Sequence, residues 1–169
     1  MILITSISVV SSHAQPKSAG LTSSFKGFAL SYEHYLPKTN MFMEMALAAD
    51  VSEAFLYRTT YPGVSLSVTW NQIFSSWELK DGTKMSLFAG PGIAAGYGKD
   101  YKTGHGYFFG LKGRAGVECQ FERRITISAC ISPILGMHVI PHSEYLSLKY
   151  YRNGLLYSLV PEIGIKYRF

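Results

Sequence analysis

The chain is short of charge. Charged residues make up 16% of its 169 residues, whereas average proteins contain about 25%. Lys and Arg exceed Asp and Glu enough to give a formal charge of +5, but they occur singly along the sequence. Nucleic-acid binding usually requires a clustered basic stripe, so this function is disfavoured. The scattered positive charge better suits an anionic membrane surface, although a slightly basic protein need not have such a partner.

Long hydrophobic runs are also missing. A membrane-spanning helix needs about 20 apolar residues, and the apolar stretch Met1–Val10 is too short. Ser12 and Ala14 stand at positions −3 and −1 before Gln15, which predicts a secretory signal peptide over residues 1–14 and one domain over 15–169. No basic residue precedes the apolar run, so the start codon is misplaced or the charge is absent. A first strand or a buried helix is the alternative interpretation.

Helical periodicity is scarce, and alternation of apolar and polar residues replaces it. Apolar side chains recur at every second position in several stretches: Met41–Val51, Gly63–Asn71, Lys84–Tyr97, Phe109–Phe121, Ile125–Met137 and Tyr157–Phe169. A period of two places each set on its own face of a β-sheet. The pattern therefore predicts an all-β protein with long strands.

Eight strands can be assigned from this alternation. They are Lys17–Thr22, Gly27–Leu36, Met41–Val51, Gly63–Trp77, Lys84–Tyr97, Tyr107–Phe121, Ile125–Val139 and Leu155–Phe169. Short connections (Pro37–Asn40, Asp81–Thr83, Glu122–Arg124) take turns with longer ones (Ser52–Pro62, Gly98–Gly106, Ile140–Gly154). This plan is typical of an eight-stranded antiparallel up-and-down transmembrane β-barrel with short periplasmic turns and longer extracellular loops. Asn153-Gly154 is a type I′ hairpin signal, which predicts a ribbon of the last two strands beyond the membrane.

Period two alone does not decide which face is outside, because a soluble lipid carrier has its apolar face inward. Small residues such as Gly90, Gly92, Ala94 and Gly96 on the mixed face favour a narrow lumen. Tyr and Trp residues fall near strand ends, as in membrane girdles: Tyr32, Tyr35, Trp70, Trp77, Tyr97, Tyr107, Tyr157 and Tyr167. The chain ends on Phe169, on the apolar face. These features favour a barrel with its apolar face toward lipid.

Four stretches carry a family resemblance: GFALSYEHYLPKTNMFMEMALAAD, LFAGPGIAAGYG, GRAGVECQFERRITISACISP and the final GIKYRF. Over residues 17 to 169 the chain resembles the small outer-membrane β-barrel proteins of the OmpA/OmpX-like type, and most of all exported barrels of Bacteroidota. The resemblance implies a monomeric barrel in the outer membrane of a Gram-negative bacterium, with loops facing outside and no defined activity. Tyr167 and Phe169 would then form the C-terminal signal for the barrel-assembly machinery.

Ten charged residues share the polar parity and are predicted to fill the lumen. They are Glu33, Glu44, Asp50, Lys84, Lys112, Arg114, Glu118, Glu162, Lys166 and Arg168. Buried charges must be paired or hydrated, so we expect an interior salt-bridge network that plugs the barrel. An ion path or a gate is the functional alternative.

Other residues give weaker indications. The spacing of the histidines indicates no metal site, and no cofactor is expected. His142, Ser143 and Glu144 include the groups needed for nucleophilic hydrolysis, and some outer-membrane barrels are lipid A deacylases. In those enzymes the His and Ser share a face, whereas adjacent strand residues point to opposite faces. Cys119 and Cys130 have opposite parity, so two free thiols are expected. GPGIAAGYG lacks the helix and the Lys-Ser/Thr pair of a phosphate loop.

The leading hypothesis is a non-enzymatic outer-membrane barrel that serves envelope integrity, adhesion or surface interaction. Basic loop residues would meet outer-membrane lipid and lipopolysaccharide: Arg58, Lys99, Lys102, Lys149 and Arg152. The alternatives are an enzyme that acts on outer-leaflet lipid, a small channel or transporter, and a soluble lipid carrier.

Overall fold

The structure is a computed structural model that describes residues 16–36, 39–51, 62–80, 82–100, 104–121, 124–141, 146–156 and 161–169. Its elements are β1 (Lys17–Ser24), β2 (Gly27–Leu36), β3 (Met41–Asp50), β4 (Gly63–Glu78), β5 (Lys84–Lys99), β6 (His105–Phe121), β7 (Ile125–Ile131), β8 (Ile134–Pro141), β9 (Leu146–Tyr150), α2 (Asn153–Leu156) and β10 (Glu162–Arg168). Within these ranges there is no helix with the length and hydropathy required to cross a membrane. The predicted signal peptide lies outside the described residues and stays a prediction.

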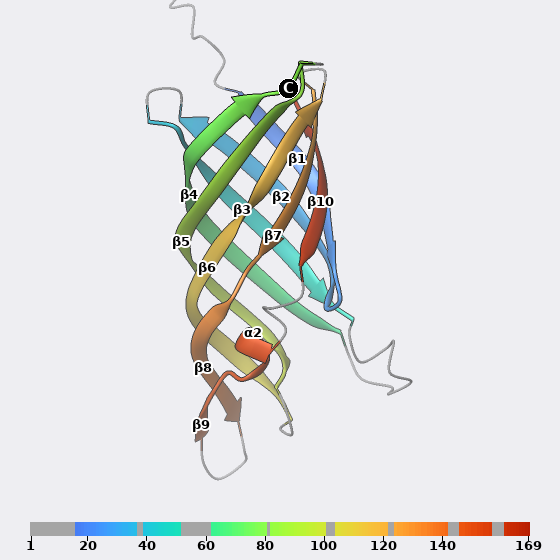
Figure 1. Cartoon of the computed structure of the whole chain (residues 1–169). Helices are drawn as coiled ribbons and strands as arrows, with labels where there is room; N and C mark the ends of the chain where they lie inside the picture. Colours follow the sequence, from blue (N-terminus) through green and yellow to red (C-terminus); the bar gives the residue numbers. More distant parts are fainter. Residues whose placement is uncertain are drawn as a thin grey trace, which may run out of the picture.

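The strands close into an antiparallel barrel (Figure 1). Each strand from β1 to β6 pairs with the next along the chain, β6 pairs with β7 and β8, and β10 pairs with both β7 and β1. β7 and β8 occupy one position in the wall, and β9 and β10, which pair with β8 and β7, occupy the next. The barrel therefore has eight strands, which confirms the predicted fold class. Both ends of the barrel sequence, Lys17 and Phe169, meet through backbone hydrogen bonds at one end, here called the turn end.

The predicted strand Ile125–Val139 is interrupted at Ser132 and Pro133. The interruption does not change the register on β6, because Ala115 pairs with Ile131 and Lys112 with Ile134. Proline has no N–H to donate to the ladder, while its carbonyl still accepts a hydrogen bond from the Gly113 N–H at 2.8 Å. β7 and β8 are therefore two halves of one wall strand.

The last predicted strand, Leu155–Phe169, is wrong at its start, because Leu155 and Leu156 belong to the short helix α2; residues 157–160, Tyr157 among them, lie outside the described residues. β10 covers Glu162–Arg168, and Asn153-Gly154 lies in α2 rather than in a hairpin turn. The predicted ribbon forms instead between β8 and β9, with Met137 opposite Tyr150. Figure 1 shows that β8 and β9 reach beyond the β1–β2 hairpin at the end opposite the C-terminus, here called the loop end.

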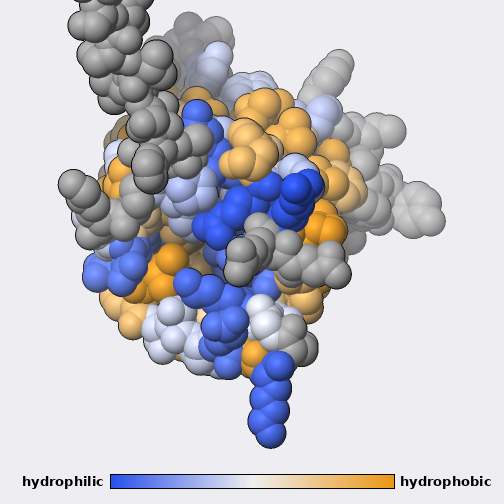
Figure 2. Space-filling model, turned by 90° about the horizontal axis from the view of Figure 1, so that it is seen from above, coloured by the Kyte–Doolittle hydropathy of each residue, from blue (hydrophilic) through white to orange (hydrophobic). Residues whose placement is uncertain are grey.

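The barrel is inside-out relative to a soluble protein. Large apolar side chains are exposed around the outer wall, for example Leu30 at 63%, Leu111 at 67% and Ile163 at 63%. Glu33 on the inner face is fully buried. From the turn end, hydrophilic residues gather in the middle of the molecule and hydrophobic ones around them (Figure 2). This arrangement contradicts the soluble carrier, whose apolar face would line the interior.

A β-bulge in β4 changes which residues face outward. Its register on β5 shifts between Ile73 and Ser75, leaving Phe74 unpaired and exposed. A bulge moves one strand out of phase with its partner. As a result Trp70 and Trp77, which differ in parity, are both exposed on the outer face.

Candidate functional site

Five charged side chains form a buried cluster in the middle of the lumen. Lys166 on β10 lies between Glu33 on β2 and Glu118 on β6, with its Nζ 2.5 Å from Glu118 Oε1 and bonded to Glu33 Oε1. Arg114 on β6 forms an ion pair with Glu44 on β3. Each of these side chains is at most 7% exposed. We call these five residues the central cluster.

Neutral donors complete the central cluster. The Ser18 hydroxyl donates to Glu33 Oε2 at 2.7 Å. The Tyr35 hydroxyl lies 3.1 Å from the same oxygen and 3.3 Å from Glu118 Oε2. Tyr35 therefore points into the lumen, and its assignment to the outer aromatic girdle is wrong. Tyr35 is two positions from Glu33 on the same strand and therefore shares its face, so the sequence alone could have placed Tyr35 in the lumen.

An aromatic layer packs against the cluster. Phe42 and Phe88 are buried and meet edge to face, with ring centroids 5.3 Å apart, and Tyr35 stacks on Phe42 at 5.1 Å. The Arg114 guanidinium lies 5.5 Å from the Phe88 ring centroid. Cations over aromatic faces are attracted by the ring quadrupole, so this layer both fills the lumen and stabilises the cluster.

The other five predicted lumen residues lie around the central cluster or toward the two ends of the lumen. Lys112 donates to Ser67 Oγ at 3.0 Å, Ser132 donates to Glu162 at 3.1 Å, and Arg168 donates to Gln120 at 2.8 Å. Asp50 is half-buried at the loop end of β3. Lys84 is exposed at the start of β5. Two of these residues are joined to the central cluster: Arg114 donates to Cys130 Sγ, which lies 3.8 Å from Glu162 Oε2, and the Arg168 guanidinium lies 4.3 Å from the Tyr35 ring centroid.

The lumen holds a cavity on either side of the central cluster. The cavity at the turn end has a volume of about 180 Å³ and is lined by Tyr35, Glu118 and Arg168, among others. The cavity at the loop end has a volume of about 80 Å³ and includes Lys26, Lys112 and Glu162 in its lining. Burial at this end lowers the pKa of Lys26, which is in the β1–β2 turn. The cluster therefore separates two small chambers.

The segment after β9 folds over the loop end of the lumen. The buried Tyr151 ring stacks on Phe108, with centroids 4.4 Å apart. Asn153 joins α2 to the end of β5, because its backbone N–H donates to Asp100 Oδ1 at 2.7 Å and its side chain donates to the Lys99 carbonyl at 2.9 Å. We call these two hydrogen bonds the latch. They explain why Asn153 lies in a helix here rather than in a hairpin turn.

The structure describes only some of the residues that the sequence suggested for catalysis or redox chemistry. His142, Ser143 and Glu144 lie outside the described residues. Cys130 is buried in the interior, whereas Cys119 is opposite the exposed Ile127, and both are free thiols as predicted. Among the described ranges, no group of His, Cys, Asp and Glu side chains has a metal-binding arrangement.

Of the comparisons with known proteins, the one with solved structures bears on the fold. No family model and no curated protein matches the chain. Among solved structures, the N-terminal β-barrel domain of Pseudomonas aeruginosa OprF is similar, with a TM-score of 0.51 and 12% identity over 91% of this chain and 96% of that one. Ail, the attachment invasion locus protein of Yersinia pestis, aligns over 91% of this chain and 94% of its own, with a TM-score of 0.39 and 12% identity. The OprF comparison supports the same barrel fold and does not bear on activity.

Proposed function

We propose that this protein is a non-enzymatic barrel of a Gram-negative outer membrane, with a plugged lumen, that serves envelope integrity, adhesion or surface interaction through its loop end. The observation that carries the proposal is the inverted polarity of the wall. Exposed apolar side chains surround a lumen in which the five charged side chains of the central cluster are at most 7% exposed. A closed barrel leaves no unpaired strand edge in lipid, so this surface suits a bilayer.

The two ends of the barrel support an orientation. Tyr167 and Phe169 are exposed at the turn end, at 50% and 64%, which suits an aromatic girdle and a C-terminal signal read by the barrel-assembly machinery. Lys149 and Arg152 are exposed at the loop end, which suits contact with lipopolysaccharide. The turn end would then face the periplasm. The monomeric state and the resemblance to exported barrels of Bacteroidota stay predictions.

A gel-mobility assay of the detergent-refolded chain from Gln15 to Phe169 tests the proposal. Unboiled protein should migrate differently from boiled protein and give a β-rich circular dichroism spectrum, because the closed barrel resists unfolding by the gel detergent. Protein that is folded and soluble without detergent, with no shift in mobility, would contradict the proposal.

A channel is the second candidate, and the chambers on both sides of the central cluster favour it. Planar-bilayer recordings separate the two functions. A plugged barrel should show no steady conductance, whereas steady conductance that changes in a Glu44→Gln variant would favour the channel.

The remaining alternative is an enzyme that acts on outer-leaflet lipid. Lipid A hydrolysis that is lost in a Ser143→Ala variant would favour this enzyme.

A further inference from the structure

A histidine near the loop end is enclosed on the inner face of the barrel. His138 on β8 is fully buried, and its Nε2 lies 3.1 Å from the Gly98 carbonyl oxygen on β5. A carbonyl oxygen can only accept, so Nε2 carries a proton, and in the neutral ring Nδ1 is then a bare acceptor. Nδ1 is buried and has no hydrogen-bond partner among the described residues. The imidazole therefore has one satisfied nitrogen and one unsatisfied nitrogen.

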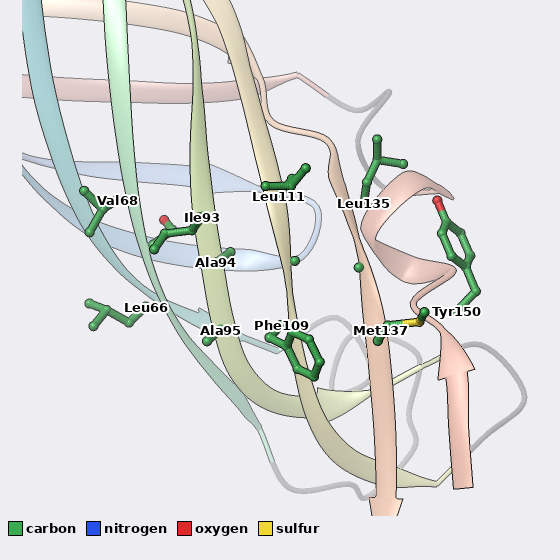
Figure 3. Close-up of a pocket in the computed structure, with 13 residues that line it drawn as sticks. Leu66, Val68, Ile93, Ala94, Ala95, Phe109, Leu111, Leu135, Met137 and Tyr150 are labelled. Carbon is green, nitrogen blue, oxygen red and sulfur yellow. The ribbon is translucent and has the colours of Figure 1, made fainter.

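The register of the β8–β9 ribbon decides which residue accompanies His138. Met137 is opposite Tyr150, and both are exposed beside an apolar groove of the outer wall (Figure 3). The next residue along β8, His138, is opposite Lys149 and is on the other face. Residues that are paired across two strands share a face of the sheet. Lys149 therefore lies on the inner side of the ribbon, together with His138.

The segment 151–156, here called the cap, packs against this histidine. The Tyr151 ring stacks on the imidazole, with centroids 6.0 Å apart, as well as on the Phe108 ring. The Tyr151 backbone N–H donates to the Gly136 carbonyl oxygen at 2.9 Å, and the latch joins the cap to the end of β5. Tyr151 and Phe108 both line the cavity at the loop end. The ring that stacks on His138 thus also closes this cavity.

The elements around His138 contribute one cation, one acid and one phenol. Lys149 comes from β9, Asp100 follows directly after β5, and Tyr151 belongs to the cap. The β6 residue that is paired with His138 is Phe108, which does not titrate. Asp100 is 2% exposed, and its Oδ1 already accepts a hydrogen bond of the latch at 2.7 Å. A protonated imidazole would therefore be repelled by the cation, while the acid is engaged in holding the cap.

The cap is the part of this enclosure that can move at the least cost. Continuous hydrogen-bond ladders hold β5, β6 and β8 in the wall. The cap is held by stacked rings, the latch and a few backbone bonds, and its helix α2 has only four residues. Such a short helix is not stable without tertiary contacts, and segments with few contacts open locally while the rest stays folded. Water therefore reaches Nδ1 most easily by displacement of the cap.

We propose that His138 makes the cap a pH-sensitive cover of the loop-end cavity, closed when the imidazole is neutral and released when it is protonated. A proton on Nδ1 creates a buried cation and a donor without an acceptor, and both are costly in an enclosed site. Since the proton binds more tightly where Nδ1 is hydrated, linkage makes acid favour the open cap. Histidine is the side chain that ordinarily changes charge between about pH 5 and 8. The inference goes beyond the proposed surface role, because mild acid would expose the cavity to the medium at the loop end.

Hydrogen-exchange mass spectrometry of the refolded barrel at about pH 8 and about pH 5, the two ends of the histidine range, tests the inference. Protection factors, which remove the pH dependence of chemical exchange, are compared for the cap and for β2. Acidification should lower the protection of the cap about tenfold, within the usual range of coupled equilibria, and should leave β2 unchanged.

Two histidine variants locate the titrating group. His138→Gln keeps an amide donor for the Gly98 carbonyl but cannot be charged, so the protection of its cap should not depend on pH. The matched control is His105→Gln, which removes a histidine at the same end of the barrel, at the start of β6, and should keep the tenfold loss. An equal loss in the two variants, or no loss in the unmodified barrel, would overturn the inference.

Nitrogen-15 NMR of the imidazole rings reports the charge and the tautomer of His138 directly, with His138→Gln identifying the signal. At about pH 8 the ring should be neutral with its proton on Nε2, and its titration should coincide with the loss of cap protection. A ring that stays neutral at about pH 5, or that titrates while the cap stays protected, would overturn the inference even if the His138→Gln variant lost its cap at both pH values. The heat-dependent gel shift should persist at both pH values, because the change is confined to the cap. Loss of the shift only at about pH 5 would refute this inference, whereas its absence at about pH 8 would refute the proposed function.

Discussion

Lys166 is the residue on which the central cluster most depends. It pairs closely with Glu33 and Glu118, lies 4.0 Å from Glu44 Oε2, and is 2% exposed. With Glu44 and Arg114 the cluster contains three acids and two bases, a formal sum of −1. Replacing Lys166 with Met makes the sum −2 and leaves two carboxylates without their cation. Removing one partner of a buried ion pair costs about 3–5 kcal/mol.

Urea unfolding of the refolded barrel, followed by the fraction of unboiled protein in the folded gel band, measures this loss. For a slope of about 2 kcal/mol per molar urea, the midpoint should fall by about 2 M. The triple variant Lys166→Met, Glu33→Gln, Glu118→Gln should recover most of the loss, because the surviving Glu44 and Arg114 form a neutral pair.

Lys84→Met is the matched control, because Lys84 has the same parity and residue type but is exposed. It should change the free energy of unfolding by less than about 0.5 kcal/mol. If Lys166→Met and Lys84→Met cost the same, or if the triple variant is less stable than Lys166→Met alone, the reasoning about uncompensated buried charge is refuted.

Three further predictions concern the wall and the latch. Leu30→Arg, mid-wall, should destabilise the barrel in lipid by about 2–4 kcal/mol and Leu79→Arg, at the turn end, by about 0–1 kcal/mol; equal unfolding midpoints would contradict the lipid-facing assignment. A Cβ at Gly90 meets the Trp70 carbonyl oxygen and one at Gly104 meets nothing within 4 Å. Gly90→Ala should therefore cost about 1–3 kcal/mol and Gly104→Ala almost nothing in the same urea assay. Asp100→Ala removes the acceptor of the Asn153 N–H, so hydrogen exchange in 151–156 should accelerate while exchange in β2 stays unchanged; unchanged rates in both would argue against the latch.

Alternation along the sequence determined most of the wall. Side-chain direction in a strand is a local property with period two, so the faces of β2, β3, β5 and β6 could be predicted without knowledge of their neighbours. The same parity separated Cys119 from Cys130 and placed Glu33 and Lys166 on the inner face. The short turns could also be predicted from the sequence, because chain reversal depends on a few adjacent residues.

Contacts between distant segments decided the rest. Lys166 is 133 residues from Glu33 and 48 from Glu118, and only the stagger of a closed barrel brings these three to one level. The bulge at Phe74 depends on the register of β4 against β5. Asn153 enters a helix because Asp100 and Lys99 accept its hydrogen bonds, overriding its local preference for a turn. Parity is set residue by residue, whereas register and closure are properties of the whole sheet.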